Sequence, residues 1–301
     1  MSRKLAVIVI GAGGRLGQTL VRSYAARYAV TGYTHSQLDL ARLNDVERTL
    51  EAQPCDVLIN AAALTNVDYC EDHRAEANRL NAEAPQLIAR ICRARGARFI
   101  HVSTDYVFDG EKRTPYTEED PANPISIYGE SKREGERQVL ETNSAALVLR
   151  VSWVFGPDCS SFVDAILERA LQHERVSAVA DKFSTPTYTE EIAALLQPFL
   201  EGEMPSGILH LANRGACSWQ EYAQWALDCC HRFGVMMKAT RVDPVALSDM
   251  TNFVARRPVY TVLGTEKFAR VTGKSARDWH DAVEEYVRVH VAQKRIAQSP
   301  T

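Results

Sequence analysis

The stretch VIVIGAGGRLGQTL, residues 7–20, decides the fold, because it runs from an apolar strand through a glycine-rich turn into a helix. Glycine permits a tight turn and lets the backbone approach a pyrophosphate, whose charge then lies at the helix N-terminus. A glycine triplet alone is weak evidence, but its place after the first strand indicates a dinucleotide site. The loop residues expected to contact the cofactor are Gly11, Gly14, Arg15, Leu16 and Gly17.

Outward from this loop, short apolar runs alternate with longer amphipathic ones through the first half of the chain. The predicted strands are 5–10, 29–33, 56–60, 97–103 and 146–152, and the predicted helices are 14–28, 43–53 and 76–95. Such alternation is typical of βαβ units. Right-handed crossovers would stack these units into an α/β fold, a Rossmann-like doubly wound parallel sheet.

The regularity fades after about residue 155, which favours a second, smaller unit. We expect an NAD(P)-binding Rossmann domain over 1–155 and mainly a C-terminal substrate-binding lobe over 156–301, with parts of 175–200 and 235–260 as candidates to return to the first domain. The strand-like run GILHLAN, 207–213, is assigned to the second lobe. The end of the chain, from residue 292, is expected to be a frayed tail.

Composition excludes several classes of function. The chain has 301 residues and a formal net charge of −3, without a basic stripe, so we expect no nucleic-acid partner. Seven cysteines without close CxxC spacing argue against a disulfide framework and a structural zinc site. The apolar run near the N-terminus ends after about six residues, too few for a signal peptide or a membrane span, so we expect a cytoplasmic protein without membrane contact.

The end of the second strand bears on the choice of cofactor. An NAD site usually has an Asp or Glu about 20 residues after the glycines, but this chain has Tyr33, Thr34 and His35 there. No carboxylate would repel a 2′-phosphate, while Arg15 could offer it charge and His35 a hydrogen bond. These residues favour NADPH. NADH is the alternative if Arg15 is merely solvated.

Two further segments could line the cofactor site. Asp39 and Leu40 fall where a loop could reach the adenine end, although Asp39 could equally cap its own loop. The segment NAAALTNVD, 60–68, ends the third strand in small residues. Ala61, Ala62 and Ala63 would let a nicotinamide ribose lie close to the backbone, or they could serve tight packing of helix on sheet.

The fourth predicted strand and the helix after it carry the candidate catalytic groups. The run HVSTDYVFDG, 101–110, ends that strand in two hydroxyls, Ser103 and Thr104, at the edge where open α/β sheets bind ligands. Tyr128 and Lys132 are four residues apart and share a helix face. A free phenol has a pKa of about 10 and is a poor acid at neutral pH, so we expect the ammonium to lower it.

These motifs together resemble the extended short-chain dehydrogenase/reductase superfamily. Within it, the runs NAAALTNVD, STDYVFDG, YGESKREGE, RVSWVFG and ARRP are similar to the dTDP-4-dehydrorhamnose reductase family, over about residues 5 to 287. The resemblance implies Thr104, Tyr128 and Lys132 as catalytic residues, with Tyr128 and Lys132 also near the cofactor. It implies NADPH-dependent reduction of the C4 ketone of a nucleotide-linked 6-deoxy-4-ketosugar, most directly dTDP-4-dehydro-L-rhamnose to dTDP-L-rhamnose.

The same resemblance suggests the substrate contacts, which are Thr65, Val67, Asp105, Tyr106, Trp153 and Arg257. Arg257 would meet the diphosphate, a role that its neighbour Arg256 could take instead. The chain departs from the family in the turn DKFSTPT, 181–187, where Lys182 replaces a glutamine and Ser184 a glycine. Some relatives are described as dimers bridged by magnesium through glutamates, but position 15 is arginine here. We therefore expect no metal, and a monomer or homodimer.

Two other functions fit the same motifs. The chain could be a cofactor-binding regulatory subunit resembling the methionine adenosyltransferase β subunit, which would bind the cofactor without turnover. It could also be a nucleotide-sugar epimerase, which would retain its NAD through the catalytic cycle.

Overall fold

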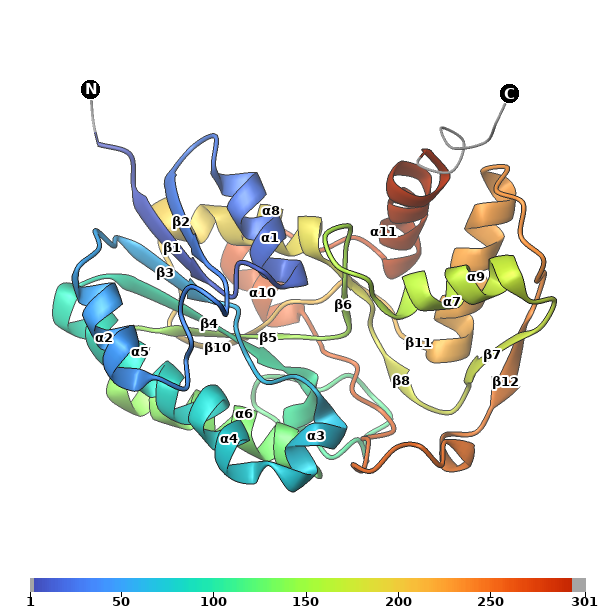
Figure 1. Cartoon of the computed structure of the whole chain (residues 1–301), viewed down its shortest axis with the longest axis horizontal. Coiled ribbons are helices and arrows are strands. Elements are labelled where there is room, and N and C mark those ends of the chain that lie inside the picture. The colour runs from blue at the N-terminus through green and yellow to red at the C-terminus, as the bar shows by residue number, and fades with distance from the viewer. Residues whose placement is uncertain (1–2, 294–301) are drawn as a thin grey trace.

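The computed structural model describes residues 3–293, which form a large sheet-centred lobe and a smaller lobe beside it (Figure 1). The large lobe holds a six-stranded parallel sheet in the order β10-β5-β4-β3-β1-β2. Its strands are β1 (Ala6–Ile10), β2 (Ala29–Tyr33), β3 (Val57–Asn60), β4 (Arg98–Thr104), β5 (Leu147–Val151) and β10 (Gly207–His210). The predicted doubly wound sheet is confirmed.

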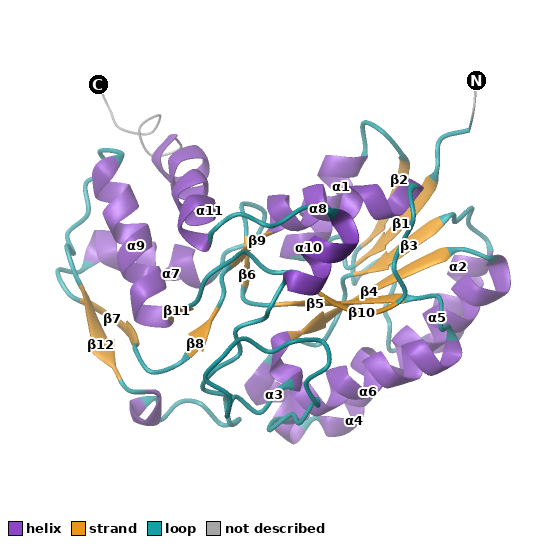
Figure 2. Cartoon of the chain, turned by 180° about the vertical axis from the view of Figure 1, so that it is seen from behind, coloured by secondary structure: helices purple, strands orange, loops and turns teal. Residues whose placement is uncertain are grey.

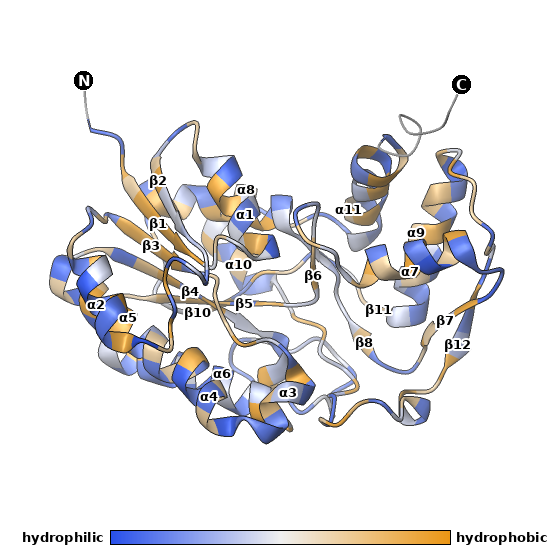
Figure 3. Cartoon of the chain, viewed as in Figure 1, coloured by the Kyte–Doolittle hydropathy of each residue, from blue (hydrophilic) through white to orange (hydrophobic). Residues whose placement is uncertain are grey.

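Helices cover both faces of the sheet, and alternate residues of each strand meet them. Val7 and Val9 of β1 pack with the helices of one face, which are α1 (Arg15–Tyr24), α8 (Thr189–Glu201) and α10 (Glu266–Thr272). Ile8 and Ile10 pack with those of the other face, which are α2 (Leu43–Glu51), α5 (Ala84–Arg95) and α6 (Ile127–Thr142). The apolar strands between polar outer helix faces are visible in Figure 3. The sheet is therefore buried on both sides, as parallel sheets require.

The third predicted helix, 76–95, is interrupted by a wider turn. The structure has α4 (Arg74–Asn78), a π-helical segment η1 (Arg79–Glu83) and then α5, preceded by the short helix α3 (Val67–Asp72). The wide turn directs Asn81 inward, where its amide bonds Leu64 and the Ser131 hydroxyl. A π-helical turn holds one residue more than an α-helical turn, and the periodicity of the sequence could not show this.

The second lobe is built from short strand pairs and three helices around an aromatic core. Its strand pairs are β7 (Val176–Val179) with β12 (Val242–Val245), β8 (Phe183–Ser184) with β11 (Cys217–Ser218), and β6 (Val154–Phe155) with β9 (Thr187–Tyr188). Its helices are α7 (Phe162–Gln172), α9 (Trp219–Arg232) and α11 (Trp279–Tyr286), which ends in the π-helical η4 (Val287–Ala292). Phe155, Tyr188 and Tyr222 lie at the centre of this core.

The run 207–213 corrects the sequence analysis, which assigned it to the second lobe. Residues 207–210 form β10, the edge strand beside β5, with Ile208 opposite Val148. Figure 2 shows α8 and α10 on the same side of the sheet, above β5 and β10 in that view. Residues 242–245, by contrast, pair with β7 in the second lobe. A short apolar strand does not encode which sheet it joins, so sequence could not place either segment.

Small β-bridges and 3₁₀ turns complete the chain, including η2 (Asp105–Val107) directly after β4 and η3 (Leu247–Asp249) after β12. The predicted frayed tail lies outside the described residues from position 294 onward. Within residues 3–293, no helix has the length and apolar character needed to cross a membrane.

Candidate active site

The glycine loop makes a close crossing between β1 and the start of α1. A Cβ at Gly17 would lie 2.0 Å from the Gly11 carbonyl oxygen, so only glycine fits there. Gly11 has φ +86°, in the left-handed region that favours glycine. Gly14 precedes α1, where no side chain caps the helix. The backbone N–H groups at this helix end can donate hydrogen bonds to a bound anion.

A cavity of about 840 Å³ runs from this loop to the carboxyl edge of β4. The expected site residues that line it are Gly11, Gly14, Arg15, Leu16, His35, Leu40, Ala61, Ala62, Ala63, Thr65, Thr104, Asp105, Tyr128, Lys132 and Trp153. Ser36 and Leu38 also line it, and sequence reasoning missed them. Ser36 lies three residues after the end of β2, next to His35, so its hydroxyl was the available signal. Gly17 acts through helix packing and is absent from this lining.

The lining suits a dinucleotide. The Ser103 hydroxyl is buried in the cavity wall and has no hydrogen-bond partner among residues 3–293. A buried hydroxyl without a hydrogen-bond partner destabilises the protein, and a bound polar group could remove this penalty by forming the missing hydrogen bond. Together with the glycine cradle and the free end of α1, this unpaired group fits a nicotinamide cofactor across the cavity.

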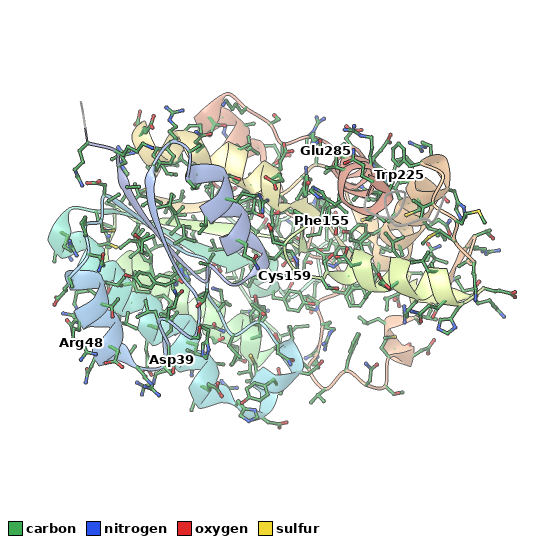
Figure 4. The ribbon with its side chains drawn as sticks, turned by 45° about the horizontal axis from the view of Figure 1, so that its top comes forward. Asp39, Arg48, Phe155, Cys159, Trp225 and Glu285 are labelled. Atoms are coloured by element: carbon green, nitrogen blue, oxygen red, sulfur yellow. The ribbon has the colours of Figure 1, made fainter. Side chains whose placement is uncertain are left out.

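Arg15 lies in a different place from the one expected. Its guanidinium donates to the carbonyls of Val154 (3.1 Å), Cys159 (3.2 Å) and Ser160. Figure 4 shows Cys159 beside the α1 ribbon, between the two lobes. The arginine therefore holds the loop after β6 against the glycine turn, and these carbonyls already accept from its Nε, Nη1 and Nη2.

His35 and Asp39 lie at the outer end of the cavity. The His35 side chain is 85% exposed, and its Nε2 lies 3.7 Å from Asp39. Asp39, labelled in Figure 4, accepts from the Ala41 N–H at 2.9 Å and pairs with Arg42. Of the two roles that the sequence left open for Asp39, these contacts are those of a loop cap, while its neighbour Leu40 lines the cavity.

The helix α6 presents Tyr128 and Lys132 to the end of β4. Ser126 caps it by accepting from the Gly129 N–H at 3.2 Å. A Cβ at Gly129 would lie 2.3 Å from the Tyr106 carbonyl oxygen, so this glycine makes room for η2 and not for a ligand. Thr104 and Tyr128 both line the cavity at this edge of the sheet.

The electrostatics of this pair differ from the expectation. Burial raises the pKa of Tyr128 above its usual value, against a lowering by its hydrogen bond to Thr104. The Lys132 ammonium does not reach the phenol to reverse this shift, because its Nζ donates to the Val102 carbonyl at 2.8 Å. Burial lowers the pKa of Lys132 itself to about 8, while the Glu136 carboxylate raises it. The expected lowering of the phenol pKa is therefore wrong for this structure.

Asp105 and Tyr106 form the wall beyond Thr104. Asp105 is buried and accepts from the hydroxyls of Ser152 (3.0 Å), Ser184 (3.1 Å) and Thr104 (3.2 Å). The ring of Tyr106 meets that of Tyr128 edge to face, with centroids 5.7 Å apart. Asp105 thus connects β4, β5 and β8 through hydroxyl groups.

Trp153 lines the cavity at the start of the second lobe. It is the one non-glycine residue with positive φ, +42°, among residues 3–293. Its indole packs against Tyr222 and Trp219 with centroids 4.8 Å and 5.7 Å away. Such a strained residue at a cavity mouth is typical of functional sites. Thr65 lines the opposite wall, and Val67 packs beneath it near Tyr128.

Arg257 is paired inside the protein, and its neighbour Arg256 is exposed. The Arg257 guanidinium donates to both oxygens of Asp68 at 2.9 Å and 2.6 Å, and lies over the Phe253 ring at 3.8 Å. The hydrogen bond from Arg257 lowers the pKa of Asp68 to about 2. This bridge connects α3 of the large lobe to the segment after β12.

The unusual Lys182 is fully buried near the same wall. Its Nζ donates to the Pro258 carbonyl at 2.6 Å and lies 5.1 Å from the Tyr106 ring centroid. Burial lowers its pKa to about 8. No three His, Cys, Asp or Glu side chains within the described part of the chain are placed to hold a metal ion.

Comparison with known proteins gives consistent matches over nearly the whole chain. The family described as RmlD substrate binding domain matches residues 5–291. The spore coat polysaccharide biosynthesis protein SpsK of Bacillus subtilis is 34% identical, covering 94% of this chain and 96% of that protein. A dTDP-4-dehydrorhamnose reductase of Mycolicibacterium smegmatis is 37% identical over 93% of this chain and 84% of that protein.

A solved structure shares the fold as well. The dTDP-4-dehydrorhamnose reductase of Bacillus anthracis, crystallised in complex with NADP, superposes with a TM-score of 0.88 at 28% identity. The match covers 95% of this chain and 99% of that one.

Proposed function

This chain belongs to the RmlD substrate binding domain family, and from that premise we propose that it is an NADPH-dependent oxidoreductase of nucleotide sugars. It reduces the C4 ketone of a nucleotide-linked 6-deoxy-4-ketosugar, most directly dTDP-4-dehydro-L-rhamnose to dTDP-L-rhamnose. The relatives named dTDP-4-dehydrorhamnose reductase and the NADP-bound structure support this assignment. NADH remains the alternative reductant.

One observation carries the proposal, which is that a single cavity joins the glycine cradle to Thr104, Tyr128 and Lys132. Bound along this cavity, NADPH supplies a hydride to the ketone carbon. The residues that would hold it are the glycine loop at the pyrophosphate, His35 and Ser36 at the adenosine end, and Lys132 at the nicotinamide ribose. Ala61 to Ala63 leave space for the backbone to approach that ribose.

Tyr128 is the proton donor in this scheme. Its raised pKa keeps the phenol protonated at neutral pH, and an alkoxide that forms on the sugar is a stronger base than a phenolate. The phenol therefore gives its proton to the developing alkoxide oxygen as the hydride arrives at carbon. Solvent restores the proton afterwards.

Thr104 orients this transfer. Its Oγ accepts from the Tyr106 N–H at 3.2 Å and donates to the Asp105 carboxylate at 3.2 Å, which fixes the hydroxyl at this edge of the cavity. We propose that this hydroxyl proton turns from Asp105 to the ketone oxygen when the sugar binds, because a donor there stabilises the charge that develops. Trp153 and Thr65 would flank the sugar, with the indole supplying apolar contact.

Arg257 is our candidate cation for the nucleotide end of the substrate, in preference to the exposed Arg256. Arg257 offers a fork-shaped guanidinium, and its bond to Asp68 holds it between the two lobes. We propose that it meets the diphosphate from this position. We also propose a monomer or homodimer in the cytoplasm. The location is supported by the seven cysteines, which form no disulfide within residues 3–293 and so fit a reducing compartment.

The decisive test mixes the purified chain with dTDP-4-dehydro-L-rhamnose and either NADPH or NADH, and follows the loss of nicotinamide absorbance. We expect turnover with release of oxidised cofactor, faster with NADPH. Binding of NADPH without turnover on several 4-ketosugars would contradict a reductase and favour a regulatory subunit. Retention of oxidised cofactor through the cycle would favour an epimerase.

Tyr128→Phe tests the proton donor itself. Loss of general acid catalysis typically costs about 10²–10⁴-fold in rate, so kcat should fall by that amount. The Kd for NADPH should stay within about twofold, because the phenol hydroxyl adds little to cofactor binding. Wild-type kcat in this variant would remove Tyr128 from the role.

A further inference from the structure

A row of three polar side chains lies buried behind the catalytic edge. Asn60 ends β3, His101 lies opposite it in β4, and Lys132 reaches His101 from α6. All three are at most 2% exposed. The Asn60 Nδ2 lies 3.3 Å from the His101 Nδ1, and the His101 Nε2 lies 3.5 Å from the Lys132 Nζ.

The hydrogen bonds of Asn60 fix the tautomer of His101. The Asn60 Oδ1 accepts from the Ala62 N–H at 3.1 Å, so its amide nitrogen must face the imidazole. That nitrogen is a donor, and the His101 Nδ1 must therefore be an acceptor. Burial and the nearby Lys132 lower the pKa of His101 well below its usual value, so the ring is neutral. Its single proton must then lie on Nε2.

This tautomer places a donor opposite the lysine. A lysine ammonium has three protons to donate. Lys132 finds one acceptor in the Val102 carbonyl, whereas the His101 Nε2–H is itself a donor and cannot accept from it. The remaining charged group near it is Glu136, whose carboxylate raises the pKa of Lys132 but is held by Arg150 in two hydrogen bonds. Tyr128, on the same helix, is neutral.

We propose that His101 is a positioning residue that keeps Lys132 short of full protonation until the cofactor binds. The ribose hydroxyl oxygens then complete the acceptor set of the lysine, so NADPH binding takes up a proton from solvent. The inference rests on the proposed function, because it needs a nicotinamide ribose beside Lys132. The pKa of Lys132, lowered to about 8, agrees with a partly charged amine in the free protein.

Calorimetry of NADPH binding at pH 8, in two buffers of different ionisation enthalpy, measures this uptake. A lysine with a pKa of about 8 is half protonated there, so we expect uptake of about half a proton per chain. A phosphate monoester has its second pKa near 6 and is already ionised at that pH. The control His35→Gln removes the imidazole at the adenosine end, and the uptake should persist in it.

Two variants separate His101 from a merely structural role. His101→Asn shortens the side chain and withdraws the Nε2–H from Lys132, so the uptake at pH 8 should fall below that of the wild type; burial of Lys132, which lowers its pKa in both proteins, accounts for the uptake that is left. Asn60→Asp is isosteric and replaces the donor at Nδ2 with an acceptor, which should move the imidazole proton to Nδ1 and lower the uptake as well. Both variants are compared with the wild type by circular dichroism and NADPH affinity.

Nitrogen NMR of ¹⁵N-histidine protein reads the tautomer without any turnover or cofactor. We expect the Nε2–H form for His101 in the wild type and the Nδ1–H form in Asn60→Asp. An Nδ1–H tautomer in the wild type, or NADPH binding without proton uptake at pH 8, would overturn the inference and leave the reductase function intact. Absence of NADPH binding would instead contradict the proposed function. If neither variant folds, the wild-type tautomer and uptake still decide.

Discussion

Replacement of Glu136 by Gln should destabilise this protein strongly, although the residue lies in a run of charges on α6. The carboxylate accepts from Arg150 Nε at 2.8 Å and Arg150 Nη2 at 2.7 Å, and the two side chains are 4% and 3% exposed. Removal of one partner of such a buried pair leaves the other charge uncompensated and typically costs about 3–5 kcal/mol. Because domains are stable by only about 5–15 kcal/mol, this is a large share of the total.

Urea unfolding followed by circular dichroism gives the free energy of unfolding of both proteins. The matched control is Glu141→Gln on the same helix, where the partner Arg137 is 54% exposed. An exposed pair contributes little, so the control should unfold close to the wild type. A second comparison is the double variant Glu136→Leu with Arg150→Met, which should recover much of the loss because well-packed apolar residues often replace a buried pair without penalty.

Two results would refute this reasoning. A Glu136→Gln protein with the free energy of unfolding of the control would mean that water reaches Arg150 and screens its charge. A double variant no more stable than the single one would mean that the cost comes from packing against Phe108, which lies 5.0 Å from the Arg150 guanidinium, and not from the unpaired charge.

Three further predictions concern the cofactor end and the bridge between the lobes. Gly17→Ala should weaken NADPH binding measured by fluorescence titration, because the new Cβ would lie 2.0 Å from the Gly11 carbonyl oxygen. Such an overlap typically costs about 1–3 kcal/mol. The control Ser23→Ala on the same helix should leave NADPH binding unchanged. His35→Asp should lower the ratio of NADPH to NADH affinity at least about tenfold, or about 1.4 kcal/mol, because a carboxylate repels the 2′-phosphate and can accept from a ribose hydroxyl; an unchanged ratio would place the phosphate elsewhere. Asp68→Asn should lower the Tm at pH 7 and should lower it less near pH 2. The hydrogen bond from Arg257 lowers the pKa of Asp68 in the folded protein to about 2. The stabilisation by this carboxylate is therefore lost as the pH falls from about 3.9, the pKa in the unfolded chain, to about 2. A Tm difference that stays constant with pH would show that the carboxylate charge is irrelevant.

Sequence was sufficient for the features that depend on local spacing. The glycine turn, the alternation of strands and helices, and the four-residue step from Tyr128 to Lys132 each follow from chain geometry, and the structure contains all three. The topology of parallel units then brings the ends of β1, β3 and β4 to one edge. This is why distant stretches such as 11–17 and 101–104 could be assigned to one site.

Partners that are distant in the sequence could not be predicted in the same way. Arg15 bonds carbonyls about 140 positions away, and Arg257 bonds Asp68 across the two lobes. An arginine next to a glycine loop predicts a phosphate partner. Which groups actually accept from it depends on tertiary packing, because a loop far away in the sequence can lie beside it in the fold. The same limit applies to Glu136, whose position among exposed charges gives no sign of its buried partner on β5.

The departures from the family pattern in the turn 181–187 now have a location. Ser184 donates to Asp105 and lies 2.7 Å from the Ser152 hydroxyl, so it adds a donor where a glycine would leave none. Lys182 places a buried amine against the Tyr106 ring. Its Nζ donates one hydrogen bond, to the Pro258 carbonyl. Neither group lines the cavity itself, but each contacts a residue next to the catalytic edge, Asp105 for Ser184 and Tyr106 for Lys182. We propose that these two departures act on recognition of the sugar rather than on the transfer of hydride and proton.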